Sequence, residues 1–248
     1  MTVDHDALAE ASRLIADARD VVVFTGAGMS AESGVPTFRD AMTGTWSRFD
    51  PQQLATPESW QNDRALVWSW YAGRAADVRR VEPNAGHEAI ARLGERKAAD
   101  GGSVAVVTQN VDDLHERAGS PVASHLHGSL FAPRCDACEA PGSSDAALDP
   151  ELQPCRLCPD GVLRPGVVWF GEPLPPGDWS AAERSFHDAD LVLVVGTSGV
   201  VYPAAELPMR AAFRGVPVIE INPEPSELAG VLLTLSATAC QVLPGLVG

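Results

Sequence analysis

The stretch Val21-Val22-Val23-Phe24, followed at once by Gly26-Ala27-Gly28, sets the fold of this chain. Four consecutive apolar residues, three of them β-branched, indicate a strand that is buried on both faces of a sheet. Glycines directly after such a strand let the backbone approach a pyrophosphate group closely. Two glycines alone are a common pattern, so their interpretation depends on the rest of the chain.

Further strand and helix patterns extend this start into a fold. Three more apolar runs resemble the first: 104–107, 191–195 and 217–221. Helical patterns occupy other parts of the chain: 1–20, 57–78 and 86–98. This arrangement predicts an α/β fold, with a Rossmann-like parallel sheet and helices on both faces. Each strand ends in small or polar residues, and open α/β sheets bind ligands at those ends, so we expect the site there.

Four of the five cysteines form two C-x2-C pairs that are sixteen residues apart: Cys135, Cys138, Cys155 and Cys158. Two such turns supply four thiolates to one tetrahedral ion, a closed arrangement typical of structural zinc. Four unligated thiols and a redox pair are the alternatives, but neither pair follows a strand at a helix start, as redox chemistry expects. Residues 134–163 are therefore predicted to form a small zinc-binding module.

The chain is acidic, with a formal net charge of -15 and a sequence pI of about 4.7. Nucleic acids and anionic membranes attract basic surfaces, so we expect neither as a partner. The sequence contains no signal-peptide pattern and no run of about 18 apolar residues. We therefore expect a cytoplasmic protein, and a monomer.

A hydride-transferring dehydrogenase fits the glycine loop poorly. The third position of a dinucleotide-binding fingerprint would be Ala31, which is allowed. However, no acidic residue ends a second strand about twenty residues later, as that fingerprint requires. Asp40 and Asp50 lie in loop-like sequence instead.

A more specific resemblance rests on a series of segments: GAGMSAESGVPTFRD (26–40), TQNVDDLH (108–115), His127-Gly128, the cysteine module, VVWFGE (167–172), Gly196-Thr197-Ser198 and Ile221-Asn222. In this order and spacing they resemble the sirtuins over nearly the whole chain. The resemblance implies an NAD-binding Rossmann-like domain over 1–133 and 164–248. Parts of 34–85 would form the helical part of the small domain beside the zinc module.

The resemblance also implies roles for individual residues. Gln109 and Asn110 would orient the nicotinamide ribose, and Asp112 would meet the nicotinamide carboxamide. His127 would be the general base, which makes His127, Asn110 and Asp112 the expected catalytic residues. The other residues expected to bind NAD are Gly26, Ala27, Gly28, Ser30, Glu32, Pro36, Thr37, Phe38, Arg39, Gly196, Thr197, Ser198, Asn222, Glu224, Ala239 and Cys240. For Cys240 the alternative, a small residue in a turn, is favoured over contact with NAD.

Two histidines compete for the role of base. His125 and His127 would point to the same side of an extended segment, so geometry alone does not choose between them. Gly128 matches the sirtuin motif and selects His127. A neutral imidazole accepts a proton near pH 7. The other histidines are expected to be structural or solvated: His5, His87, His115 and His187.

The implied reaction transfers an acyl group to NAD, which is consumed. The acyl-lysine carbonyl oxygen attacks the ribose carbon that bears nicotinamide, and His127 then activates the neighbouring ribose hydroxyl. The products are free lysine, nicotinamide and acylated ADP-ribose. A mono-ADP-ribosyltransferase and a non-catalytic NAD-binding protein stay open as alternatives.

Tyr71 and Arg74 share a helix face, and they are the residues expected to select the acyl group. A guanidinium binds a carboxylate bidentately, so the pair suits succinyl or malonyl groups. The neighbouring Ala55-Thr56-Pro57-Glu58 and two tryptophans also resemble class III sirtuins. A surface arginine beside a core tyrosine is the alternative. Residues 167–172 would pair with the substrate backbone, with Val168, Phe170 and Gly171 binding substrate and Trp169 lying either there or in the core.

Overall fold

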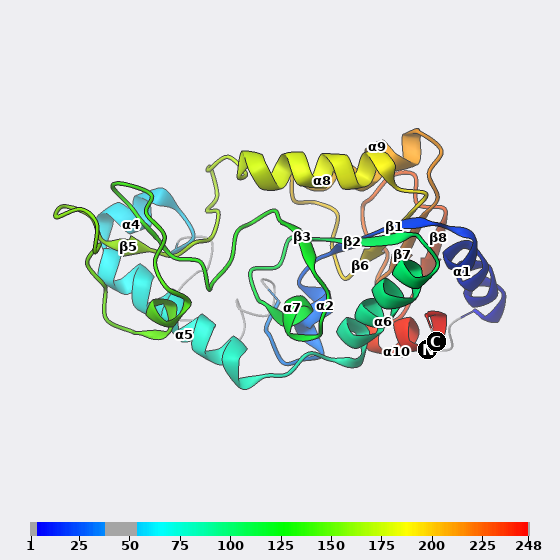
Figure 1. The fold of residues 1–248 in the computed structure, drawn as a ribbon, viewed down its shortest axis with the longest axis horizontal. Helices are drawn as coiled ribbons and strands as arrows, with labels where there is room; N and C mark the ends of the chain where they lie inside the picture. Colours follow the sequence, from blue (N-terminus) through cyan, green and yellow to red (C-terminus); the bar gives the residue numbers. More distant parts are fainter. Residues whose placement is uncertain (1–3, 38–53, 248) are drawn as a thin grey trace.

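A parallel sheet forms the centre of the protein in this computed structural model, which describes residues 4–37 and 54–247. Its six strands follow the order β3-β2-β1-β6-β7-β8 (Figure 1). They are β1 (Asp20–Thr25), β2 (Ser103–Thr108), β3 (Val122–His125), β6 (Leu191–Val195), β7 (Val218–Ile221) and β8 (Leu233–Leu235). The predicted Rossmann-like sheet is therefore confirmed, and the four predicted strands are β1, β2, β6 and β7.

Two strands, β3 and β8, were not expected from the sequence. Both lie at the edges of the sheet, where a strand has only one neighbour. β3 has four residues and includes Ser124 and His125, while β8 has only three residues. Short edge strands need no continuous apolar run, so they leave little trace in the sequence.

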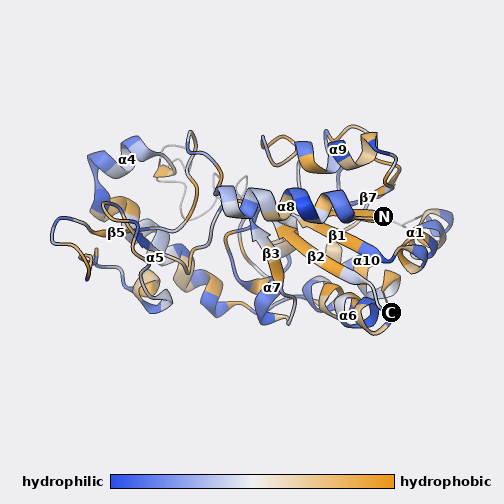
Figure 2. Cartoon of the chain, turned by 45° about the horizontal axis from the view of Figure 1, so that its top comes forward, coloured by the Kyte–Doolittle hydropathy of each residue, from blue (hydrophilic) through white to orange (hydrophobic). Residues whose placement is uncertain are grey.

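Helices cover both faces of the sheet. One face packs against α1 (His5–Asp17), α6 (Ala85–Ala99) and α10 (Ala239–Leu246), and the other against α8 (Pro176–Asp188) and α9 (Glu206–Phe213). Strand side chains alternate between the two cores: Val21 and Val23 enter one, while Val22 and Phe24 enter the other. Figure 2 shows β1 and β2 in orange beside amphipathic helices. The apolar run is thus buried on both sides, as predicted.

The register of the central strands aligns their carboxyl ends. Thr25, the last residue of β1, pairs with Thr108 of β2 and Val195 of β6. From β1 the chain builds the sheet first toward β3 and then, through β6, toward β8. This change of direction between β1 and β6 is where open α/β sheets bind ligands.

Lys97, the only lysine of the chain, ties α6 to the end of α1. Its ammonium donates hydrogen bonds to the carbonyl oxygens of Ile15, Ala16 and Ala18 at 2.6, 3.2 and 2.5 Å. No following helical turn supplies amide donors to these carbonyls. A cation at this position also complements the helix dipole. Lys97 is 6% exposed, so water replaces few of these bonds.

We expect Lys97→Met to lower the free energy of unfolding by about 2 kcal/mol, because the buried carbonyls lose a charged donor. Urea unfolding followed by circular dichroism measures the change. Arg92→Met is the matched control on the same helix, since the Arg92 side chain is 52% exposed. Equal effects of the two substitutions would contradict this account.

A small lobe (residues 54–80 and 130–170) lies beyond one end of the sheet (Figure 1). It contains α4 (Pro57–Asn62), α5 (Arg64–Arg80), the 3-10 helix η2 (Ser144–Leu148), β4 (Arg134–Cys135) and β5 (Leu163–Arg164). Its separate core includes Trp60, Trp68, Trp70 and Trp169. β4 and β5 pair antiparallel at the ends of the 134–163 segment, and we propose these boundaries for the zinc module.

The predicted helix over 57–78 is instead two helices, α4 and α5, and this correction has a local cause. Asp63 leaves the helical conformation, with φ -152° and ψ 86°. Its carboxylate accepts a hydrogen bond from the Leu66 amide at 2.9 Å and so caps α5. An aspartate at this position favours a new helix start over continuation of the old one.

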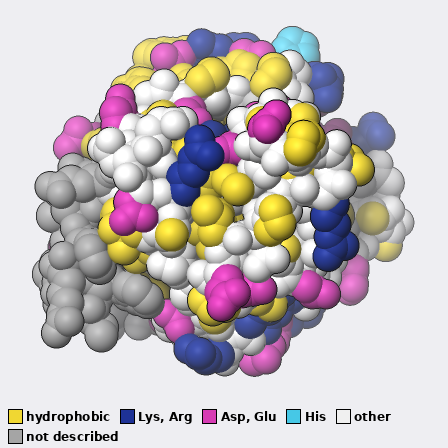
Figure 3. Space-filling view, turned by 90° about the vertical axis from the view of Figure 1, so that its left-hand side faces the viewer, with side chains coloured by type: hydrophobic (Ala, Val, Ile, Leu, Met, Phe, Trp, Pro, Cys, Tyr) yellow, Lys and Arg dark blue, Asp and Glu magenta, His cyan; other side chains and the backbone are white. Residues whose placement is uncertain are grey.

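The surface of the small lobe mixes charges. In the face shown in Figure 3, acidic, basic and apolar side chains are interspersed, and no single basic patch is visible there. Among the described helices, none combines the length and apolar character that crossing a membrane requires.

Candidate active site

The glycine loop after β1 packs against the loop after β6. The Gly26 amide donates to the Val195 oxygen at 3.0 Å, and the Gly28 amide donates to the Gly196 oxygen at 2.8 Å. A Cβ on Gly28 would lie 2.7 Å from the Cα of Gly196, so this contact requires glycine. The two predicted phosphate-binding segments, 26–28 and 196–198, therefore lie side by side at the carboxyl edge of the sheet.

Thr197 connects this pair of loops to two other strand ends. Its hydroxyl accepts a hydrogen bond from Gln109 Nε2 at 3.0 Å, and its carbonyl accepts one from Asn222 Nδ2 at 2.9 Å. These contacts bring the ends of β2, β6 and β7 together. All four predicted strand ends thus meet at one place.

Asn110 and Asp112 are buried close to this edge. Asn110 Nδ2 donates to Ser30 Oγ at 3.1 Å, and the Leu114 amide donates to Asp112 Oδ1 at 3.1 Å. Asp112 is 5% exposed, and burial raises the pKa of its carboxyl above the usual range. Leu114 opens the short helix α7 (Leu114–Arg117). A buried amide and carboxyl here offer the donors and acceptors that an amide-bearing ligand needs.

His127 has one ring nitrogen engaged and one available. Its Nδ1 lies 3.0 Å from the carbonyl oxygen of Gln109. A carbonyl only accepts hydrogen bonds, so Nδ1 carries the proton and Nε2 keeps its lone pair. Burial lowers the pKa of His127, although the bond to Gln109 acts in the opposite direction. The imidazole is therefore neutral near pH 7 and suited to accept a proton through Nε2.

His125, the competing histidine, has contacts at both ring nitrogens. Its Nε2 lies 2.6 Å from Glu116 Oε1, and its Nδ1 lies 3.3 Å from the Asn110 carbonyl oxygen. Burial alone would lower the pKa of His125, but the hydrogen bond and charge of Glu116 raise it overall. A cationic, paired imidazole is a poor base, so the geometry favours His127 for this role.

The four predicted zinc ligands converge. Their sulfur atoms all lie within 4.8 Å of one another, with Cys135–Cys158 at 3.5 Å and Cys138–Cys155 at 3.8 Å. Zinc–sulfur bonds of about 2.3 Å in a tetrahedron place the sulfurs about 3.8 Å apart, which this spacing matches. Backbone amides donate to the sulfurs of Cys135 and Cys155, which favours the thiolate form. The cluster therefore fits one closed structural zinc.

The proposed substrate segment lies between the base and the small lobe. The Val168 amide donates to the His127 carbonyl at 2.9 Å, and the Phe170 amide donates to the Ala55 carbonyl at 3.0 Å. Val168 is half-buried, Phe170 is 51% exposed and Gly171 has a φ of 87°. Trp169 between them is buried in the core of the small lobe, in agreement with the core interpretation of that residue.

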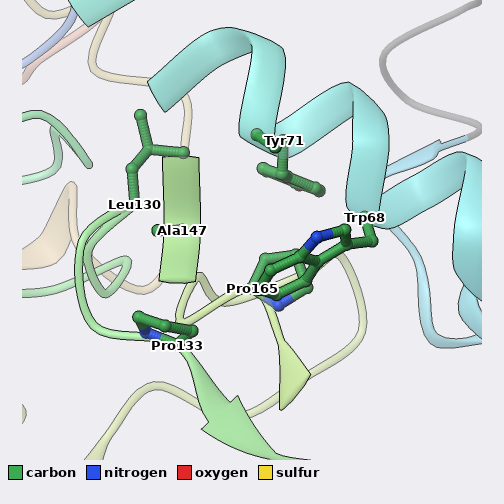
Figure 4. Close-up of a pocket in the computed structure, with 7 residues that line it drawn as sticks. Trp68, Tyr71, Leu130, Pro133, Ala147 and Pro165 are labelled. Carbon is green, nitrogen blue, oxygen red and sulfur yellow. The ribbon is translucent and has the colours of Figure 1, made fainter. Parts of the chain in front are cut away.

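Tyr71 and Arg74 lie behind this segment on α5. The Tyr71 hydroxyl accepts a hydrogen bond from Trp169 Nε1 at 3.1 Å. The Arg74 guanidinium lies 5.0 Å from the Trp70 ring centroid and 5.8 Å from that of Tyr71. Figure 4 shows a small cavity beside Tyr71, and Arg74 is not among its lining residues, which also include Trp68, Ala72, Leu130, Pro133, Ala147 and Pro165.

Comparison with known proteins identifies the family. The sequence profile of the Sir2 family matches residues 26–203. The chain belongs to the Sir2 family. It is 48% identical over 252 residues to NAD-dependent protein deacylase 2 of Corynebacterium efficiens, covering 99% of this chain and 98% of that protein.

Solved Sir2 structures have the same fold. A Sir2 homologue in complex with NAD is 45% identical, with a TM-score of 0.88, covering 96% of this chain and 92% of the other. A triple mutant of a Sir2 homologue in complex with 2'-O-acetyl ADP-ribose is 44% identical, with a TM-score of 0.86 over 98% and 95% of the two chains. NAD is thus the co-substrate of this Sir2 chain.

Glu32 and Cys240, two other residues predicted for the NAD site, contact each other. The Cys240 amide donates to Glu32 Oε2 at 3.1 Å, which joins the end of the glycine loop to the start of α10. Bonds from Cys240 and Thr238 lower the pKa of Glu32, although burial acts the other way. Ala239 is buried, whereas Glu224 and Pro36 are exposed. Thr37 is half-buried, and Phe38 and Arg39 lie outside the described residues.

The remaining histidines agree with the structural interpretation. The rings of His87 and His115 meet edge to face at 4.8 Å, and His115 Nε2 lies 3.0 Å from Thr25 Oγ1. Burial lowers the pKa of His87 to about 4 and that of His115 well below its ordinary value. Both are neutral core residues of this Sir2 chain, and His5 and His187 are exposed.

One group near the substrate segment had not been singled out in the sequence. Arg164 and Glu172 form a two-bond ion pair beside Trp169, with distances of 2.7 and 2.9 Å. Arg164 precedes the VVWFGE motif and Glu172 is its last residue, but nothing in the motif indicates that they pair. Only the folded segment brings them together.

Proposed function

We propose that this chain is an NAD-dependent protein deacylase that prefers lysine acyl groups ending in a carboxylate, such as succinyl and malonyl, and also removes acetyl. Family membership and the named deacylase relative support the general activity. The arrangement of Tyr71 and Arg74 supports the acyl preference. The paired thiolates, which require reduced cysteines, support a cytoplasmic location.

The chain's own residues supply binding, orientation and proton transfer. When bound, NAD provides the ribose that receives the acyl group and the nicotinamide that leaves. Gln109 and Asn110 hold the ribose, and Asp112 faces the carboxamide. His127 Nε2 takes the proton of the attacking ribose hydroxyl. The 167–172 segment binds the substrate backbone, so the acyl-lysine enters beside His127.

The state of Arg74 is the observation that carries the acyl preference. Among residues 4–37 and 54–247, no carboxylate forms an ion pair with this half-buried guanidinium. Burial lowers its pKa, while the nearby Tyr71 and Asp112 act in the opposite direction. A largely desolvated cation that forms no ion pair gains from an anionic ligand. An acyl chain with a terminal carboxylate is such a ligand, whereas acetyl has no charge to offer.

We expect Arg74→Met to lower kcat/KM for a succinyl-lysine peptide by roughly 10- to 100-fold, the loss of one or two charged hydrogen bonds. Acetyl-lysine turnover should change less than about threefold, because acetyl does not contact the guanidinium. Steady-state kinetics on paired peptides measures both. Arg80→Met, on the exposed end of α5, is the control. An unchanged ratio of succinyl to acetyl turnover in Arg74→Met would refute the assignment.

A further inference from the structure

The hydrogen bond between Trp169 and Tyr71 fixes the direction of the Tyr71 hydroxyl proton. An indole N–H only donates, so the Tyr71 oxygen accepts from Trp169 Nε1 at 3.1 Å. The phenol proton must then point elsewhere. Tyr71 is 5% exposed, and within the described ranges 4–37 and 54–247 no protein acceptor for this proton is found. The proton is therefore left for a ligand that reaches the Tyr71 hydroxyl.

Trp169 is itself held rigidly by a buried ion pair. Glu172 accepts two bonds from Arg164, at 2.7 and 2.9 Å, and one from the Trp169 amide at 2.9 Å. The Arg164 guanidinium also lies 3.6 Å from the centre of the Trp169 ring. These contacts fix both the main chain and the ring of Trp169, so its indole N–H points in a single direction.

Trp169 also connects two parts of the substrate site. Its neighbours Val168 and Phe170 are bonded to His127 and Ala55 and belong to the proposed lysine-binding segment. Its ring points the opposite way, into the core of the small lobe, and reaches Tyr71 on α5. The residue that lies within the peptide-binding segment therefore also orients the group expected to contact the acyl chain.

We propose that Trp169 is a positioning residue for acyl selectivity. Arg164 and Glu172 hold Trp169, which in turn directs the Tyr71 hydroxyl to donate a hydrogen bond to the acyl carboxylate. This inference rests on the proposed function, because it takes Tyr71 as part of the acyl pocket. Without Trp169 the hydroxyl rotates freely and loses part of its bond to the carboxylate. A merely structural tryptophan would affect stability and leave the acyl preference alone.

Trp169→Phe tests the proposal against Trp179→Phe, which makes the same change on α8, outside the small lobe. Trp179 packs against the core between the sheet and α8 and does not line the cavity beside Tyr71. We expect Trp169→Phe to lower the ratio of succinyl to acetyl kcat/KM roughly fivefold to tenfold, the worth of about one hydrogen bond. The KM for NAD should stay the same. An equal change of the ratio in both variants, or none in Trp169→Phe, would overturn the proposal.

A second measurement does not depend on the acyl preference. The chain has two tyrosines, so Tyr202→Phe leaves Tyr71 as the only source of a ¹³Cζ-tyrosine signal. In this background Trp169→Phe should shift the signal and Trp179→Phe should leave it in place. No shift in Trp169→Phe overturns the inference even if the enzyme prefers succinyl. If wild-type enzyme shows no succinyl preference, the proposed function fails and the selectivity role with it, while the signal still reports whether Trp169 holds Tyr71.

Discussion

Replacing His127 by alanine should lower the rate of deacylation by about a thousandfold, within the 10²- to 10⁴-fold range typical of a lost general base. Of the other described imidazoles near the strand-end site, His125 is paired with Glu116, and the neutral rings of His87 and His115 are fully buried in the core, away from any ligand. Affinity for NAD should change little, since the loops after β1 and β6 stay intact. Peptide kinetics and calorimetry with NAD measure the two quantities.

The pH profile gives this prediction an internal check. The pKa of His127 is lowered from 6.5 by burial, so the base is active at pH 7 and is lost only as the pH falls through that lowered value. The acid limb of kcat should therefore have its midpoint below 6.5. His187→Ala, on the exposed surface of α8, is the control for substituting a histidine. Near-normal turnover of His127→Ala would show that another group is the base.

Removing the metal should unfold the small lobe. Cys135 is fully buried, and its sulfur contacts hold the two C-x2-C turns together. Structural zinc in small modules is worth about 10 kcal/mol or more of folding energy, so Cys135→Ser should lose the ion and lower the thermal midpoint by more than about 10 °C. Metal analysis by mass spectrometry and calorimetric unfolding measure both effects.

Cys240→Ser is the control for the zinc prediction. It makes the same atomic change at a cysteine outside the cluster, in the first turn of α10. We expect one zinc per chain and a midpoint within about 2 °C of the wild type. If Cys135→Ser kept its zinc, or lost it without loss of stability, the structural role would be wrong.

The parts of the fold that the sequence predicts are those with local causes. β1 and β6 are buried on both faces, so apolar runs mark them. The zinc ligands are marked by spacing within each turn. The edge strands β3 and β8 lack such runs, and the break at Asp63 depends on a single capping bond. A helix pattern alone cannot reveal that bond.

The site was predictable mainly through the resemblance, because its contacts join distant residues. Choosing between His125 and His127 requires knowing that Glu116 meets one and the Gln109 carbonyl meets the other. Trp169 and Tyr71 are 98 positions apart, and their bond has no signature in either segment. Spacing rules describe single turns of chain, and they do not reach across the fold.

Mass spectrometry of the products formed from a succinyl-lysine peptide and NAD distinguishes deacylation from ADP-ribosylation of protein. We expect free lysine peptide, nicotinamide and succinylated ADP-ribose in equal amounts, with a slower parallel reaction on the acetyl peptide. Protein that carries ADP-ribose, or nicotinamide release while the peptide keeps its acyl group, would contradict deacylation and indicate an ADP-ribosyltransferase instead.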